Sequence, residues 1–343
     1  MSGPDGAQPA IRRPEVVWTE EDWRRLQQRA AAVLLRCPDV RPARGAVAHL
    51  ARKVMRRYTS SFHLVTRFLP GDKRRDVELI YANVRYPDEV VDTFPLSSDE
   101  RLERLDRWGS AYERALVAAS PRDAVEAGAP ALLACFAELV RDHCIPPEHY
   151  RAFLAAMRAD VAPRRYADMQ ALIDGYVYGS AVVVGYLLAH AFGPARPDTF
   201  GTAIEAAREL GIGLQMTNFL RDVAEDLGRG RVYLPMDRLA EVGITEPDPA
   251  NPDHRTALGC LVIRMAREND ARYEAAQRGL PAFAPDVRSA VEACIRVYRL
   301  LNDRLAGSGG DIGERVQVPL RDKWRALPPS KVWVLPLAYL ARR

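Results

Sequence analysis

Apolar residues recur along this chain with the spacing of α-helices, and the alternation typical of β-strands is nearly absent. Proline and glycine interrupt the pattern, as at Gly71, Pro146-Pro147 and Gly193-Pro194. The pattern therefore predicts an all-α protein. We expect its helices over residues 19–36, 43–57, 72–92, 98–118, 130–142, 147–158, 168–192, 198–227, 254–277 and 285–306.

The first residues differ from the rest of the chain. Residues 1–15 hold Pro4, Pro9 and Pro14 and few apolar side chains, a composition typical of disorder. We expect a disordered tail over residues 1–15 and a single helical domain over residues 16–343. Apolar residues make up 48% of the 343 residues, which is enough for a sizeable core. The longest apolar stretch, Ala181 to Leu188, is shorter than the ~20 residues of a membrane helix and is expected to be buried.

Charge and cysteine usage exclude some classes of function. The chain has 49 basic and 45 acidic residues, and no block of like charge indicates a nucleic-acid partner. The five cysteines form no CxxC pair, so they predict neither a zinc site nor a disulfide framework. No signal peptide is recognisable at the start of the sequence. We expect a cytoplasmic protein, with peripheral membrane contact still open if its product is a long apolar chain.

The segment from Glu209 to Leu227 carries the strongest chemical signal. It is apolar around most of a helical wheel, yet Asn218, Asp222 and Asp226 follow one another at i, i+4 and i+8 on one face. Carboxylates on a buried helix are costly unless something neutralises them. Hard cations such as Mg²⁺ bind oxygen ligands of this kind, together with phosphate and water. The spacing favours a Mg²⁺ site over a solvated acidic face.

A second polar stripe lies in the segment from Leu79 to Asp92. Tyr81, Arg85, Asp88 and Asp92 fall on one helical face, again in an apolar context. Two carboxylate pairs, each on an apolar helix, indicate a polyanion bound through metal ions. Arginine and lysine would bind its phosphate oxygens. The candidates for this role are Arg85, Arg231, Arg315 and Lys323.

Four segments resemble the squalene/phytoene synthase family, and the resemblance covers most of residues 55–325. The most specific is Gln215–Asp226, because the sequence Gly228-Arg-Gly-Arg-Val-Tyr-Leu-Pro235 follows it at the family's spacing. The other three are Ser60–Pro70, Tyr81–Asp92 and Tyr176–Gly185. The resemblance implies an isoprenoid-synthase-type helical bundle with a central cavity between two acidic helices.

The resemblance also implies a Mg²⁺-dependent enzyme that ionises an allylic prenyl diphosphate. Metal ions and basic side chains would neutralise the leaving diphosphate, and an aromatic-lined cavity would shield the allylic cation. Tyr81 and Tyr176 would line the reacting centre, and Arg85, Arg315 and Lys323 would hold the diphosphate. The implied metal ligands, some of them also catalytic, are Asp88, Asp92, Asn218, Asp222 and Asp226.

Three departures from the family pattern bear on the second substrate. Pro87 precedes Asp88, where the family usually reads Asp-Asp-x-x-Asp, and a proline kinks a helix, so we expect the first metal site to be displaced. Ser60 replaces a basic residue that is common at this position. Val182 and Val183 replace smaller residues and would narrow the cavity if they face it.

The sequence supports two functions almost equally. The family default is head-to-head condensation of two prenyl diphosphates. The departures slightly favour transfer of a shorter prenyl group to a non-prenyl, aromatic acceptor in specialised metabolism. Cyclisation of a single substrate is a third alternative. An inactive binding module would be expected to lose its metal ligands, whereas both carboxylate pairs are present. No GxGxxG fingerprint predicts a nicotinamide-binding module.

Overall fold

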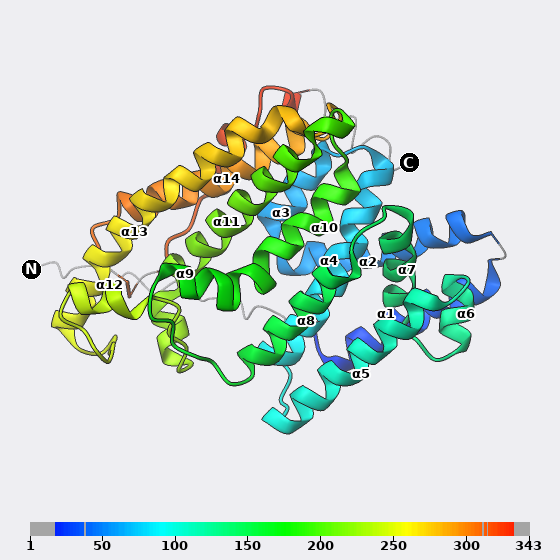
Figure 1. Cartoon of the computed structure of the whole chain (residues 1–343), viewed down its shortest axis with the longest axis horizontal. Helices are drawn as coiled ribbons and strands as arrows, with labels where there is room; N and C mark the ends of the chain where they lie inside the picture. Colours follow the sequence, from blue (N-terminus) through cyan, green and yellow to red (C-terminus); the bar gives the residue numbers. More distant parts are fainter. Residues whose placement is uncertain (1–17, 38, 311, 314, 333–343) are drawn as a thin grey trace, which may run out of the picture.

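The computed structural model describes residues 18–332 except 38, 311 and 314, and over these residues it contains helices and no β-strand (Figure 1). The predicted all-α class is confirmed, whereas the predicted tail over residues 1–15 lies outside the described residues. The α-helices are α1 (Glu20–Arg36), α2 (Val40–Tyr58), α3 (Ser60–Val65), α4 (Gly71–Asp92), α5 (Ser98–Val117), α6 (Pro121–Glu126), α7 (Ala131–Asp142), α8 (Pro147–Asp160), α9 (Met169–Leu172), α10 (Val183–Phe192), α11 (Phe200–Gly228), α12 (Met236–Glu241), α13 (Pro252–Gly279), α14 (Arg288–Ala306) and α15 (Leu320–Ala326).

Local signals explain where several helices begin. Ser97 caps α5 by accepting a hydrogen bond from the backbone of Glu100, whose carboxylate accepts one from the backbone of Ser97 in return. Helix α8 begins at Pro147, where the missing N–H of proline costs nothing. The short helices α3, α6, α12 and α15 were not predicted, because six or seven residues are too few to show a helical period.

The predicted helix over residues 168–192 is a composite. Helices α9 and α10 flank a π-helical segment, Ile173–Val182, which contains the Tyr-x-Tyr motif. A π-helical turn often marks a functional site. Residues Met169–Phe192 are long and apolar enough to cross a membrane by composition alone. In this fold they instead contact α8 and α11, and α10 also contacts α4. We therefore describe them as the central helix of the bundle.

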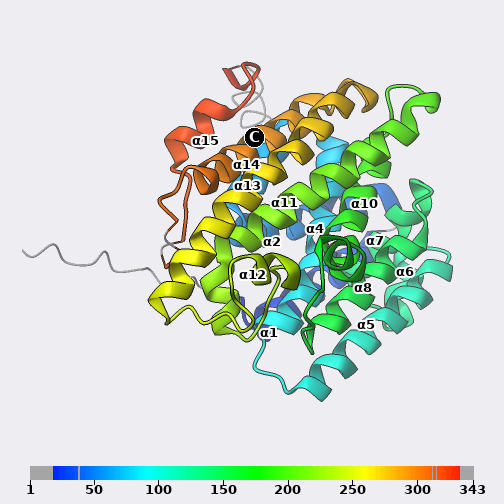
Figure 2. The same cartoon turned by 60° about the vertical axis from the view of Figure 1, so that its left-hand side comes forward.

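The central helix lies between two groups of helices. Figure 1 shows α11, α13 and α14 running side by side on one flank, with α5, α7 and α8 on the other. Glycines allow the close approach: a Cβ on Gly179 would lie 2.6 Å from Ala156 Cβ on α8, and one on Gly185 would lie 2.8 Å from the Ala207 carbonyl oxygen on α11. Figure 2 shows α15 at the edge of the molecule, where it packs against α14.

Val182 and Val183 are both fully buried but belong to different hydrophobic clusters. Val182 belongs to the cluster that includes residues of the π-helical segment and α11, and Val183 belongs to the cluster that includes residues of α4, α7 and α8. Both side chains are covered by other parts of the bundle, and the narrowing of a substrate cavity by these valines stays a prediction.

Candidate active site

The first acidic motif lies on α4, around Arg85. Its Nη1 donates to Asp88 Oδ2 at 2.5 Å, its Nη2 pairs with Glu89, and its guanidinium carbon lies 4.2 Å from the centre of the Tyr58 ring. Burial raises the pKa of Asp88 to about 6, and the charges of Asp92 and Glu89 add to this effect. Glu89 is fully buried and accepts a hydrogen bond from Tyr58 Oη at 3.0 Å. Glu89 therefore anchors α4 internally.

The second acidic motif lies on α11, where Asp222 is already paired. Arg221 Nε donates to Asp222 Oδ1 at 2.8 Å, and Arg315 Nε reaches the same oxygen at 2.8 Å. Burial acts to raise the pKa of Asp222, but these guanidinium groups outweigh it and hold the pKa below its usual value. Burial lowers the pKa of Lys323 on α15, and the charge of Arg221 lowers it further. The structure thus brings Arg315 to Asp222 and places Lys323 within reach of the charge of Arg221, while their binding of diphosphate stays a prediction.

Asp226, one turn beyond Asp222, has the opposite environment. Burial and then the charge of Asp222 raise the pKa of Asp226 to about 7. Asn218, one turn before Asp222, is half-buried on the same helix. The predicted stripe is thus present on α11, and Asp226 is the carboxylate in it that most lacks a neutralising charge.

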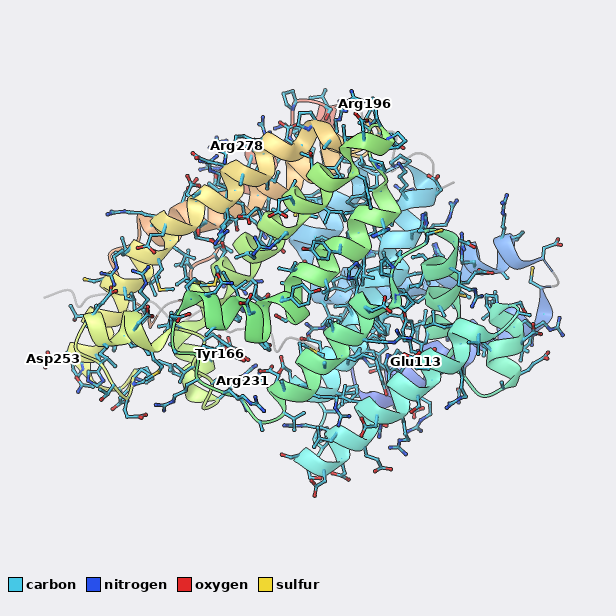
Figure 3. The ribbon with its side chains drawn as sticks, viewed as in Figure 1. Glu113, Tyr166, Arg196, Arg231, Asp253 and Arg278 are labelled. Carbon is cyan, nitrogen blue, oxygen red and sulfur yellow. The ribbon has the colours of Figure 1, made fainter. Side chains whose placement is uncertain are left out.

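Arg231 connects the two motifs. Its Nη2 lies 2.6 Å from Asp92 Oδ1 on α4 and 3.6 Å from Asp160 Oδ2 on α8, and its charge also acts on Asp226. Only 11% of its side chain is exposed. Figure 3 shows Arg231 close to Tyr166, on the side of the molecule where α8, α9 and the segment after α11 come together. One guanidinium thus pairs with Asp92 of the first motif and acts through its charge on Asp226 of the second.

Asp160 is a site residue that sequence reasoning missed. It ends α8, is buried, and accepts hydrogen bonds from Tyr176 Oη at 3.0 Å and Tyr233 Oη at 2.5 Å. Burial raises its pKa. Its partners lie 16 and 73 residues away in sequence, so no local spacing could have indicated it. Arg221 was missed as well, although it directly precedes Asp222.

Aromatic rings form a wall beside these carboxylates. Tyr176 stacks on Tyr233 with ring centres 5.0 Å apart, and Tyr233 stacks on Phe219 at 4.3 Å. Tyr81 stacks on Phe62 at 5.8 Å. Tyr81 and Tyr176 belong to different hydrophobic clusters, so the two predicted lining residues do not stack on each other. Ring faces are negative and stabilise a nearby cation.

The donor chemistry fits Mg²⁺ shared with a diphosphate. Asp88 and Asp226 have raised pKa values, and so gain from a cation that neutralises them. Over the described ranges of the chain, no three His, Cys, Asp or Glu side chains are grouped closely enough to hold a metal alone. Mg²⁺ normally keeps waters and binds one or two carboxylates together with substrate phosphates. The residues that would hold it are Asp88, Asp92, Asn218, Asp222 and Asp226.

Pro87 does not end α4. The helix continues through this buried proline to Asp92, and Asp88 and Asp92 both lie near the cations described above. Helix α4 therefore places Asp88 beside Arg85 and Asp92 beside Arg231.

The chain is similar to known proteins over most of its length. Residues 55–322 match the family Squalene/phytoene synthase. The chain is 32% identical over 296 residues to phytoene synthase of Arthrospira platensis, covering 82% of this chain and 92% of that protein. It is also 32% identical over 313 residues to 15-cis-phytoene synthase of Synechococcus elongatus, covering 86% and 97%. The predicted aromatic acceptor finds no support in these relatives, which favour the alternative of head-to-head condensation.

Solved structures show the same fold. A dehydrosqualene synthase crystallised with a ligand superposes with a TM-score of 0.69 at 21% identity, covering 87% of this chain and all of that one. A squalene synthase from Alicyclobacillus acidocaldarius gives 0.61 at 21% identity, covering 81% and 96%. The family match spans well over half of the sequence, and the relatives at 32% identity cover most of it. The chain therefore belongs to the squalene/phytoene synthase family and is a prenyltransferase.

Proposed function

We propose that this protein condenses two identical prenyl diphosphates head to head, and that it requires Mg²⁺. Its similarity to phytoene synthases supports this reaction type. The observation that carries the proposal is that each acidic motif has its own arginine. Asp88 pairs with Arg85 on α4, and Asp222 pairs with Arg221 and Arg315. Two sets of carboxylate and guanidinium suit two diphosphates, whereas a single donor with an apolar acceptor needs one.

The ion pair between Asp222 and Arg315 can open to bind a diphosphate. Arg315 is 39% exposed and its bonds to Asp222 are accessible to solvent, so a diphosphate can compete for the guanidinium. When bound, Mg²⁺ would neutralise the charge that develops on the leaving diphosphate. Arg315 then donates to phosphate oxygens, and Lys323 adds a point charge. Arg85 has the corresponding role at the first motif.

The aromatic wall protects the allylic cation. Asp160 accepts from the hydroxyl groups of Tyr176 and Tyr233, which fixes both rings and turns their faces along the stack that ends at Phe219. Fixed ring faces stabilise positive charge and exclude water from the reacting carbon.

All five cysteines are free thiols, which supports the proposed location in a reducing cytoplasm.

A product assay tests the proposal. The enzyme and Mg²⁺ are incubated with geranyl, farnesyl or geranylgeranyl diphosphate alone, and with dimethylallyl diphosphate plus indole-, carbazole- and phenol-type acceptors. We expect one donor alone to give a hydrocarbon with twice its carbon number, and geranylgeranyl diphosphate to be preferred. Product formation only after an aromatic acceptor is added would refute condensation and restore the aromatic-acceptor hypothesis.

A further inference from the structure

Helix α4 contains a gap in its backbone hydrogen bonding next to the first acidic motif. Pro87 lacks the N–H that would normally bond to the carbonyl oxygen of Asn83, four residues earlier. This carbonyl lies inside the bundle, because Asn83 is fully buried. An unpaired buried carbonyl would weaken the turn from which Asp88 projects.

The hydroxyl of Tyr150 on α8 fills this gap. Tyr150 Oη donates to the Asn83 carbonyl oxygen at 2.7 Å, and Trp108 Nε1 on α5 donates to Tyr150 Oη at 2.8 Å. Tyr150 is fully buried and Trp108 is 6% exposed, so water does not compete for these bonds. The Trp108 bond uses a lone pair of the tyrosine oxygen and leaves its proton directed at Asn83.

The same turn is tied to a third helix. Asn83 Nδ2 donates to the Leu79 carbonyl at 2.9 Å and to the Leu132 carbonyl on α7 at 3.1 Å. Helix α8 also carries Asp160, which Arg231 links to Asp92. Both ends of the first acidic motif are therefore connected to α8, one through Tyr150 and the other through Asp160.

We propose that Tyr150, oriented by Trp108, is a positioning residue that replaces the N–H missing at Pro87 and so sets the placement of Asp88 and Asp92. Its functional part rests on the proposed binding of diphosphate with Mg²⁺ at this motif. The hydrogen-bonding part stands on the geometry of α4, α5 and α8 alone.

A double-mutant cycle in urea unfolding tests the hydrogen-bonding part. Tyr150→Phe should raise the unfolding equilibrium constant about 10- to 100-fold, because it leaves the Asn83 carbonyl and the Trp108 N–H unpaired. In a Pro87→Ala background the restored N–H bonds to the Asn83 carbonyl. There the fold-increase in the unfolding equilibrium constant caused by Tyr150→Phe should be about 5 to 10 times smaller. The loss at Trp108 is common to both backgrounds and cancels. Equal effects in the two backgrounds, within about twofold, would overturn the compensation.

Tyr112→Phe is the matched control. Tyr112 is fully buried and packs edge-on against Tyr150 with ring centres 4.7 Å apart, but its hydroxyl has no hydrogen-bond partner within the described part of the chain. Removing this hydroxyl should change the unfolding equilibrium constant by less than about twofold, or stabilise the fold. A cost equal to that of Tyr150→Phe would show that any lost buried hydroxyl has this effect, and would contradict the specific role.

Binding of inorganic pyrophosphate with Mg²⁺, measured by calorimetry, tests the positioning part. Tyr150→Phe should weaken binding about tenfold, as loss of an outer partner of metal ligands does, and Tyr112→Phe should leave it unchanged. Unchanged binding in Tyr150→Phe would overturn the positioning role. Absence of binding in the unmodified enzyme would instead refute the proposed function, while the unfolding cycle would still decide the hydrogen-bonding part.

Discussion

Asp222 and Asp226 lie one turn apart on α11, and the same isosteric change should have opposite effects on stability at the two positions. Asp222 is held by Arg221 and Arg315, which lower its pKa. Asp226 is half-buried, and its partial burial and the charge of Asp222 raise its pKa to about 7. We therefore expect Asp226→Asn to stabilise the metal-free protein at pH 8 and Asp222→Asn to destabilise it, while both abolish Mg²⁺-dependent turnover.

The magnitude for Asp226 follows from its pKa. The rise from 3.8 to about 7 is about three units, and one unit corresponds to ~1.4 kcal/mol, so the upper bound is ~4 kcal/mol. Partial exposure and salt screen the repulsion, which leaves about 1–2 kcal/mol. Since the folded pKa exceeds the unfolded value, the ionised group destabilises the fold above pH 7. This penalty disappears as the pH falls toward 4.

Ionised Asp222 has the opposite effect on stability. Its folded pKa is below the unfolded value of 3.8, so it stabilises the fold above about pH 4, and that stabilisation is lost as the pH falls further. Asp222→Asn keeps the shape but loses the charge-assisted bonds to Arg221 and Arg315. Because Arg315 is 39% exposed, we expect a loss of about 1–2 kcal/mol.

The assay is urea unfolding of both variants and the unmodified protein in EDTA, at pH 8 and pH 5. Asp226→Asn should raise the free energy of unfolding at pH 8 and by less than about half as much at pH 5, whereas Asp222→Asn should lower it at both values. Diphosphate release with Mg²⁺ is measured in parallel. A lower free energy of unfolding for Asp226→Asn at pH 8, or turnover retained by either variant, would contradict these roles of the two carboxylates.

Two further predictions concern packing and charge. Gly179→Ala would place a Cβ 2.6 Å from Ala156 Cβ and should destabilise the protein by about 1–3 kcal/mol in thermal unfolding. Gly201→Ala on α11, where nothing lies within 4 Å, is the control and should be neutral or stabilising; equal losses would contradict the close approach of the central helix to α8. Arg231→Gln leaves the buried Asp160 without its cation and should cost about 2–3 kcal/mol at pH 8 and less at pH 5; a loss independent of pH would contradict the bridging role.

The sequence predicts those parts of the site that depend on local periodicity. Asp88 and Asp92 share a face of α4, and Asn218, Asp222 and Asp226 share a face of α11, because residues four apart are neighbours on any α-helix. The long helices are predicted for the same reason. The π-helical segment Ile173–Val182 is not, since its apolar residues favour no one face and give no period to read.

Contacts between distant segments account for the rest. Asp160 meets Tyr233 from 73 residues away, and nothing near either residue indicates the pair. The displacement of the first metal site expected from Pro87 stays a prediction, but the donor that Tyr150 supplies from α8 could not be read from the local sequence. Whether Val182 and Val183 face the cavity stayed open at the level of sequence, because an apolar helix carries no information about which neighbour each side chain meets.

The central claim is that two diphosphates leave for each carbon–carbon bond formed between prenyl groups. The most direct measurement is the ratio of diphosphate released to hydrocarbon formed, with geranylgeranyl diphosphate as sole organic substrate and with Mg²⁺ or EDTA present. We predict two diphosphates per product molecule with Mg²⁺ and no release in EDTA. A ratio of one, release that depends on an added aromatic acceptor, or turnover that persists in EDTA would contradict the account.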